Sequence, residues 1–204
     1  MPRRIRDPES RHRVIAAAWR LVAVQGIHAT TVRGIAAEAG VTTGSVTHYF
    51  EDKAQVMAAV LRYNNKLAAE RVVAAVGGRT GLDALSRGVE AMLPHDEDRL
   101  RWWTVWMAFW GERGAHRMVA EEGANAGYGA LEGWLHQAFE SAVAAGELPS
   151  TVDPRYEAER VLVLVGGLGL MSGGEPRLLR EVRRRSRRML AEHWASLTRS
   201  PVLD

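Results

Sequence analysis

The sequence predicts an all-α protein with a small N-terminal head of three helices and a larger helical domain, about nine to ten helices in total. Apolar residues recur at the spacing of a buried helix face along most of the chain, and glycine or proline ends most of these stretches. Residues 31–50 also have the pattern of two short helices joined by a tight turn, a helix-turn-helix. We place the head at residues 1–53 and the helical domain at residues 54–204.

The composition is that of a globular chain that folds without covalent cross-links. Of the 204 residues, 47% are hydrophobic and 25% are charged, and none is cysteine. The absence of cysteine excludes disulfides and is compatible with a reducing cytoplasm. The N-terminal sequence lacks the apolar core of a signal peptide, and the longest apolar run, residues 161–171, is far shorter than the roughly twenty residues that a bilayer needs. We therefore expect a protein without a signal peptide or a membrane segment.

Positive charge is concentrated in the head. The formal net charge of +3 arises within residues 1–53, because acidic and basic residues balance in residues 54–204. This modest excess agrees with phosphate binding. Arg3, Arg4 and Arg6 fit either an arm that enters a DNA minor groove or a solvated tail.

The first helix is expected from Asp7 to about Ala23. Asp7 is suited to cap it, and Pro8 to occupy its first position. Its core stripe has i, i+4, i+7, i+8 spacing and supports the two-helix unit that follows. The stripe consists of Val14, Ala18, Leu21 and Val22.

The two short helices have recognisable ends. Thr31 is a suitable N-cap for the first, and Gly40 ends it because glycine readily adopts the left-handed conformation. Thr42 caps the second, in which Val46 and Phe50 lie four residues apart on the inner face. Asp52 and Gln55 then form a capping pair that places Lys53 at the start of the next helix.

The outer face of the second short helix is polar and sterically small, which suits a helix in a DNA major groove. We expect Thr43, Gly44, Ser45, Thr47 and His48 to face the bases. Thr31, Tyr49 and Lys53 are expected to anchor phosphates. The complete candidate DNA-binding set is Thr31, Arg33, Thr42, Thr43, Gly44, Ser45, Thr47, His48, Tyr49 and Lys53.

These residues resemble the tetracycline-repressor (TetR) family of bacterial transcription regulators. The resemblance rests on the threonine that opens the first short helix, the turn A-x-x-A-G-V, the run G-x-V-x-x-Y-F and the following D-K. It implies a cytoplasmic, homodimeric, ligand-responsive repressor on a pseudo-palindromic operator. Thr47 departs from the pattern, since the family usually has an aromatic residue there that braces the helix on the DNA backbone.

The helical domain begins with a helix of about 23 residues from Ala54, which ends at Gly77–Gly78, and a second helix at residues 82–93. His95, Asp96, Glu97 and Asp98 follow. Consecutive residues point in different directions, so we interpret this run as a polar loop that caps the next helix and predict no metal site.

Residues 101–112 predict a helix with one aromatic face, made of Trp102, Trp103, Trp106, Phe109 and Trp110. Such a face fits either core packing, a subunit contact included, or the wall of a ligand pocket. The pattern W-x-x-F-W resembles the choline-responsive branch of the family. Electron-rich indole rings would suit an organic cation, and an aromatic compound is the other inducer class that we expect.

The remaining chain predicts short broken helices over residues 111–129 and then three helices, at residues 128–145, 155–172 and 177–197. In the helix at 155–172, residues 161–170 are apolar on all sides, and their glycines would allow another helix to approach closely. The resemblance implies a four-helix dimer interface from residues 128–145 and 155–172. The arginines at 183–188 fit a solvated helix face better than a second nucleic-acid patch.

The sequence thus predicts a ligand-responsive repressor that binds double-stranded DNA as a homodimer. It contains no G-x-S-x-G, H-E-x-x-H or glycine-rich phosphate loop, so we predict neither an enzyme nor a cofactor. Two alternatives stay open: a transcriptional activator, and an architectural DNA-binding protein that has no inducer.

Overall fold

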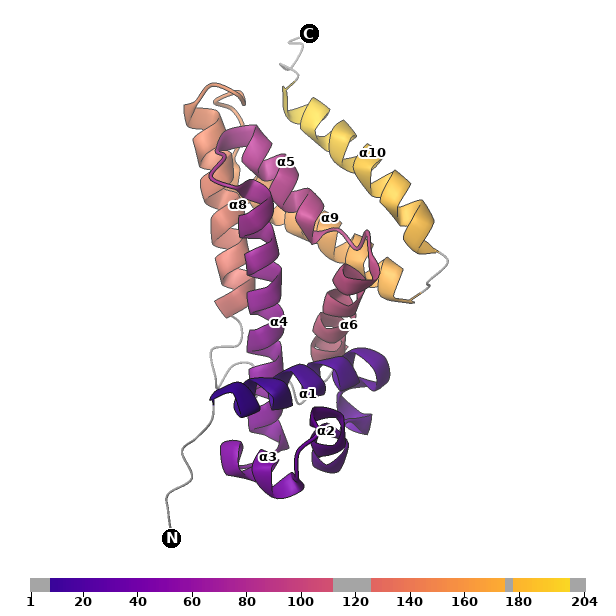
Figure 1. The fold of residues 1–204 in the computed structure, drawn as a ribbon. Coiled ribbons are helices and arrows are strands. Elements are labelled where there is room, and N and C mark those ends of the chain that lie inside the picture. The colour runs from indigo at the N-terminus through magenta and orange to yellow at the C-terminus, as the bar shows by residue number, and fades with distance from the viewer. Residues whose placement is uncertain (1–7, 112–125, 175–177, 199–204) are drawn as a thin grey trace. The chain divides into compact units, whose positions relative to one another are not determined.

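The computed structural model describes residues 8–111, 126–174 and 178–198, and every regular element among them is an α-helix (Figure 1). This confirms the predicted fold class. The described elements are α1 (Pro8–Ala29), α2 (Val32–Ala39), α3 (Thr43–Tyr49), α4 (Lys53–Val76), α5 (Gly81–Met92), α6 (Glu97–Gly111), α8 (Ala126–Ala144), α9 (Pro154–Gly174) and α10 (Leu178–Thr198). The predicted cap at Asp7, the arginines at 3, 4 and 6, and residues 112–125 of the predicted broken helices lie outside the described residues. Residues 126–129, for which broken helices are also predicted, form the start of α8.

The chain divides into two compact units, and the division falls inside two helices. The first unit contains α1, α2, α3, α4 through Leu67, and α6 from Thr104. The second contains the rest of α4, α5, the first part of α6, α8, α9 and α10. Within the described part of the chain, no helix combines the length and apolar character needed to span a bilayer.

The first unit is built around α1, which packs against α2 and α3. Val14, Ala18 and Val22 of the predicted stripe are completely buried, whereas Leu21 is only partly so. Gly26 interrupts α1 with φ 77° and ψ 174°, close to the predicted end at Ala23. The core residues contributed by the neighbouring elements are Ile35, Ala36, Val46, Phe50, Val56 and Val60.

The second unit is centred on α8, which packs against both α5 and α9. Two glycines allow large rings to lie directly on helix backbone. A Cβ at Gly88 of α5 would collide with the indole of Trp134, and one at Gly169 of α9 would collide with the indole of Trp103. The close approach predicted for the α9 glycines therefore holds at Gly169, where the neighbour is an indole within the same subunit.

Of the predicted polar loop at residues 95–98, His95 and Asp96 precede α6, as expected, whereas Glu97 and Asp98 belong to the first turn of α6. Asp96 Oδ1 accepts the backbone N–H of Arg99 at 2.7 Å, so it caps α6. Asp96 also forms ion pairs with Arg99 (2.9 Å) and Arg71 (3.6 Å). His95 Nε2 lies 3.0 Å from Ser186 Oγ of α10.

The arginines of α10 lie mostly in ion pairs. Arg185 pairs with Glu181 at 2.7 Å and Arg188 with Glu192 at 2.7 Å, one helical turn away in each case. Arg187 instead reaches Glu90 of α5 at 2.8 Å. For the arginines whose side chains are described, these contacts favour a solvent-exposed, charged helix face over a second nucleic-acid patch.

Candidate nucleic-acid interface

Local capping fixes the turn between α2 and α3. Thr31 Oγ1 accepts the backbone N–H of Gly34 at 3.1 Å and so caps α2. Gly40 has φ 67° and ψ 33°, the left-handed conformation. The next backbone N–H, that of Val41, returns to the carbonyl oxygen of Ala36 at 2.9 Å. The predicted cap, glycine and reversal are all confirmed.

The recognition helix, α3, is capped by a residue next to its outer face. Thr42 Oγ1 accepts the backbone N–H of Ser45 at 3.1 Å and lies 3.0 Å from Ser45 Oγ. Ser45 is therefore engaged in the cap and is only partly exposed. Val46 and Phe50 are 1% and 4% exposed, which confirms the predicted inner face.

The side chains predicted to read bases lie mainly on the exposed side of α3. Thr43, Gly44, Thr47 and His48 are all exposed. A Cβ at Gly44 would meet only Thr42 Oγ1, at 3.7 Å, an ordinary contact distance. Since packing inside the protein does not require glycine at position 44, its small size fits a close approach from outside.

Thr47 differs from its neighbours in how its hydroxyl is used. The hydroxyl donates to the carbonyl oxygens of Thr43 and Gly44, each at 3.3 Å, as threonine often does inside a helix. This leaves the methyl group of Thr47 for outward contacts. A methyl group cannot replace an aromatic brace, but it can pack on another methyl group.

The predicted phosphate anchors surround α3 in the sequence, and each of the three contacts another residue of the head. Because Thr31 Oγ1 accepts its capping bond, its proton stays available to donate outward. Tyr49 is partly buried, with its ring 5.2 Å from that of His48. Lys53 Nζ donates to the carbonyl oxygen of His28 at 3.3 Å. Arg33 is exposed on α2.

Two contacts of the head differ from what the sequence predicts. The guanidinium of Arg11 lies 5.1 Å from the centre of the Phe50 ring, which brings another positive charge to the end of α3. At the start of α4, the backbone N–H of Gln55 donates to Asp52 Oδ1 at 2.8 Å, as predicted. The Gln55 side chain, however, accepts from the backbone N–H of Glu51 and not from that of Asp52.

The aromatic face of α6 is mostly buried. Trp102, Trp103, Trp106 and Phe109 are 3–8% exposed, whereas Trp110 is 57% exposed. These burials agree with core packing for four of the five rings, and the ligand pocket remains a prediction.

Polar and ring contacts hold the tryptophans of α6. Trp103 Nε1 donates to the carbonyl oxygen of Met92 at 2.8 Å, and Trp106 Nε1 donates to Asn65 Oδ1 at 2.8 Å. Trp102 and Trp103 lie together in the second unit, with centroids 4.9 Å apart. Trp106 and Trp110 stack in the first unit at 5.3 Å.

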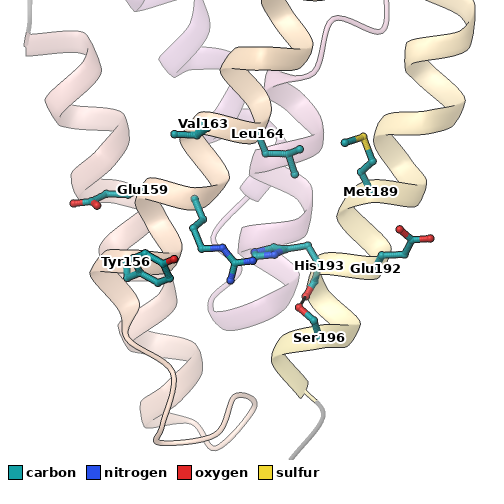
Figure 2. A pocket seen from close by; sticks show the side chains of 9 residues that line it. Tyr156, Glu159, Val163, Leu164, Met189, Glu192, His193 and Ser196 are labelled. Carbon is teal, nitrogen blue, oxygen red and sulfur yellow. Dashed lines mark hydrogen bonds between the residues drawn. The ribbon is translucent and has the colours of Figure 1, made fainter. Parts of the chain in front are cut away.

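Sequence reasoning missed a groove between α9 and α10, with a volume of about 630 Å³. Figure 2 shows that side chains from both helices line it. Its apolar lining residues Tyr156, Val163 and Met189 are well exposed. One of its lining residues, His193, has its Nε2 atom 3.3 Å from Glu157 Oε2. Burial lowers the pKa of His193, although Glu157 opposes this effect.

The sequence and fold match known bacterial regulators along nearly the whole chain. Residues 14–60 match the model for bacterial regulatory proteins of the tetR family, and residues 81–199 match that for the C-terminal part of BetI-type transcriptional repressors. The transcriptional regulator PksA of Bacillus subtilis is 25% identical over 198 residues, which cover 97% of this chain and 94% of PksA.

Two solved structures are similar over most of the fold. A TetR-family regulator from Rhodococcus sp. superposes with a TM-score of 0.79 at 21% identity and covers 95% of this chain and 100% of its own. A regulator from Saccharomonospora viridis, solved in complex with choline, has a TM-score of 0.74 at 25% identity and covers 88% of this chain and 94% of its own. The chain therefore belongs to the TetR family of DNA-binding transcriptional regulators, which are not enzymes, and its C-terminal part is of the BetI type.

Proposed function

We propose that this protein is a homodimeric repressor that acts in the cytoplasm, binds a pseudo-palindromic operator and is released by a small molecule. The exposed face of α3 carries the proposal. Its small polar residues lie outward on a helix whose inner side is fixed by Val46 and Phe50. Two such helices, about 34 Å apart in a dimer, would enter successive major grooves on one side of the duplex.

The dimer surface that we propose consists of α9 and α10. The family resemblance implies an interface from residues 128–145 and 155–172, which correspond to α8 and α9. On α8, however, Leu135 and Phe139 are already completely buried within the subunit. Large apolar side chains are exposed instead on α9 and α10, as expected of an interface. They are Tyr156, Val163, Leu170, Met171 and Met189.

For the inducer, we propose an organic cation that contacts the aromatic face of α6. Indole rings attract cations through their π-electron faces, and Trp110 presents such a ring to solvent. The relative from Saccharomonospora viridis was solved with choline, a quaternary ammonium compound, which makes choline the first compound to test. An aromatic compound is the second class to test.

Selection of bound duplexes from a random pool by the purified protein tests the DNA-binding proposal. We expect an enriched inverted repeat, with half-site centres about one helical turn apart. Recovery of unrelated sequences with equal affinity would instead indicate an architectural DNA-binding protein. A reporter gene placed behind the selected site then distinguishes a repressor from an activator, because DNA binding does not determine the sign of regulation.

A titration with choline, followed by tryptophan fluorescence and by release of the selected duplex, tests the ligand. Trp110→Ala should abolish the fluorescence response and the release while DNA binding is kept. Trp194→Phe in α10 is the control, since it removes a tryptophan away from the aromatic face. A full choline response in Trp110→Ala would place the ligand elsewhere. No response to choline or to aromatic compounds in the wild type would contradict the proposed inducer classes.

A further inference from the structure

Two consecutive asparagines on α4 each accept a hydrogen bond from a tryptophan on a different helix. Trp19 Nε1 of α1 donates to Asn64 Oδ1 at 2.7 Å. Trp106 Nε1 of α6 donates to Asn65 Oδ1 at 2.8 Å. We call these four residues the asparagine junction. All four belong to the first compact unit.

The geometry of a helix explains why two adjacent residues can serve two neighbours. Successive side chains on an α-helix point about 100° apart, so Asn64 reaches α1 while Asn65 reaches α6. Asn64 is completely buried, and Trp106 is only 8% exposed. Tyr63, the preceding residue, adds an edge-to-face contact with Trp19 at 6.2 Å.

The chemistry of the junction fixes orientation as well as proximity. An indole N–H can only donate, and the amide oxygen of asparagine is a directional acceptor. A shift of either tryptophan away from its asparagine would break a partly buried hydrogen bond, which is unfavourable. The junction therefore resists independent movement of α1 and α6. Leucines in place of Asn64 and Asn65 would make no directional bonds, so α1 and α6 could slide along α4.

The two ends of the junction lie at functional parts of the head and of α6. Trp19 is on α1, and α1 packs directly against both α2 and α3. Trp106 stacks on Trp110 with centroids 5.3 Å apart and planes 27° apart. A molecule that displaces Trp110 would thus disturb the ring that is bonded to Asn65.

We propose that Asn64 and Asn65 are positioning residues that couple the DNA-binding face of the head to α6. This inference rests on the proposed function, because it assigns a path for the response of DNA binding to a ligand. Coupling between two sites is reciprocal in free energy. Binding of DNA must therefore change the surroundings of Trp106, even when no inducer is present.

The indole ¹⁵N–¹H signals of the protein report this change directly. The signal of Trp106, one of seven tryptophans, is assigned from its loss in Trp106→Phe. The probe is a saturating amount of the duplex recovered by selection. The test protein is the double variant Asn64→Leu/Trp19→Phe, which removes both the donor and the acceptor of the bond between α1 and α4. It keeps the bond between Trp106 and Asn65.

We expect DNA to shift the Trp106 signal in the wild type, and the double variant to retain DNA binding with less than about half of that shift. Arg20→Gln is the control. It breaks an exposed ion pair of 2.8 Å between Arg20 of α1 and Glu38 of α2 without touching the junction. The control should keep the full shift. If Asn64 were only structural, the double variant would be less stable than the wild type but would keep the full DNA-induced shift of the Trp106 signal.

Several outcomes would overturn the inference. A Trp106 signal that DNA does not move in the wild type excludes the coupling, and so does a double variant with the wild-type shift. If the double variant does not fold, Trp19→Phe alone removes the donor, keeps a large ring and is measured in the same way. Failure of the proposed function can be told apart from failure of this inference. In the first case the wild type binds no selected duplex, whereas in the second it binds the duplex without the expected change at Trp106.

Discussion

Thr47 presents a methyl group on the recognition helix, because its hydroxyl is bonded to helix carbonyl oxygens. The methyl group of thymine is the apolar feature of the major groove, so we predict a contact between the two. Thr47→Val keeps a methyl group and should keep the base preference. Thr47→Ser should lose the base preference. It should bind the preferred duplex about fourfold more weakly than the wild type, because it lacks one buried methyl group.

Duplexes in which thymine is replaced by deoxyuridine provide the measurement for Thr47. Removal of the critical thymine methyl should weaken binding of the wild type and of Thr47→Val, but not of Thr47→Ser. Equal sensitivity of all three proteins at every thymine would show that position 47 does not read a base.

Lys53 is held at the start of α4 by its bond to the carbonyl oxygen of His28, and we predict that it contacts a phosphate. Lys53→Ala should weaken binding to all duplexes by a similar factor. It should also reduce the slope of log affinity against log salt by about one, because one fewer counterion is released. Lys66→Ala is the matched control, since Lys66 is an exposed lysine on the same helix. A selective loss for one sequence in Lys53→Ala would assign Lys53 to base reading.

At the scale of the helices, Gly40 and Gly44 serve different purposes although they are four residues apart. Gly40 has φ 67° and open space around its Cβ position, so alanine there is strained by conformation alone. Gly40→Ala should lower the free energy of unfolding by about 1–2 kcal/mol, as measured with urea.

Gly44→Ala should leave stability unchanged or raise it by up to about 1 kcal/mol, and yet weaken DNA binding. Destabilisation by Gly44→Ala, or unaltered DNA binding, would remove the argument for a close approach at Gly44.

A pH-dependent contact joins α5 to α10. The hydrogen bond from Arg187 lowers the pKa of Glu90 below its usual 4.5, against the opposing effect of burial. Because the folded state then binds the proton less readily than the unfolded state, this contact stabilises the fold above about pH 4.5 and is lost as the pH falls further. Arg187→Gln should therefore reduce the loss of stability that occurs as the pH falls below about 4.5.

Urea unfolding at a series of pH values measures the effect of Arg187. Arg188→Gln is the control, because Arg188 pairs with Glu192 one turn away on the same helix. The control should retain the pH dependence of the wild type. Equal curves for Arg187→Gln and the wild type would show that the contact with Glu90 does not contribute.

The features predicted from the sequence are those that local chemistry determines. Thr31, Gly40 and Thr42 end or begin helices through bonds to residues within five positions, so their roles follow from the sequence itself. Partners far apart in the chain have no such signal. Asn64 meets Trp19 across 45 positions and Lys53 meets His28 across 25, and only the packing of helices brings them together.

The choice of dimer helices illustrates the same limit for whole elements. An apolar segment predicts burial, but it does not say whether the neighbour belongs to the same subunit. The apolar face of α8 is used inside the subunit, against α5 and α9, whereas Val163 of α9 is 75% exposed. The same ambiguity applies to α6, where four rings are buried and only Trp110 faces solvent.

At the scale of the whole molecule, operator binding depends on a dimer, because a single α3 reads only one half-site. We predict that Val163→Asp, which places a charge on the exposed apolar stripe of α9, gives a monomer. Burial of an unpaired carboxylate in an interface is strongly unfavourable. The monomer should still bind a half-site, but it should lose the additional affinity for the full inverted repeat.

Val73→Asp supplies a closely matched comparison for this prediction. Val73 of α4 is 71% exposed, nearly the same as Val163, but it lies outside α9 and α10. Light scattering should therefore report a dimer for Val73→Asp and a monomer for Val163→Asp at the same micromolar concentration. If Val73→Asp dissociates while Val163→Asp remains a dimer, the subunits associate through another surface. Half-site binding by both variants would show that the head is intact, so any loss on the full repeat arises from association and not from the fold of α3.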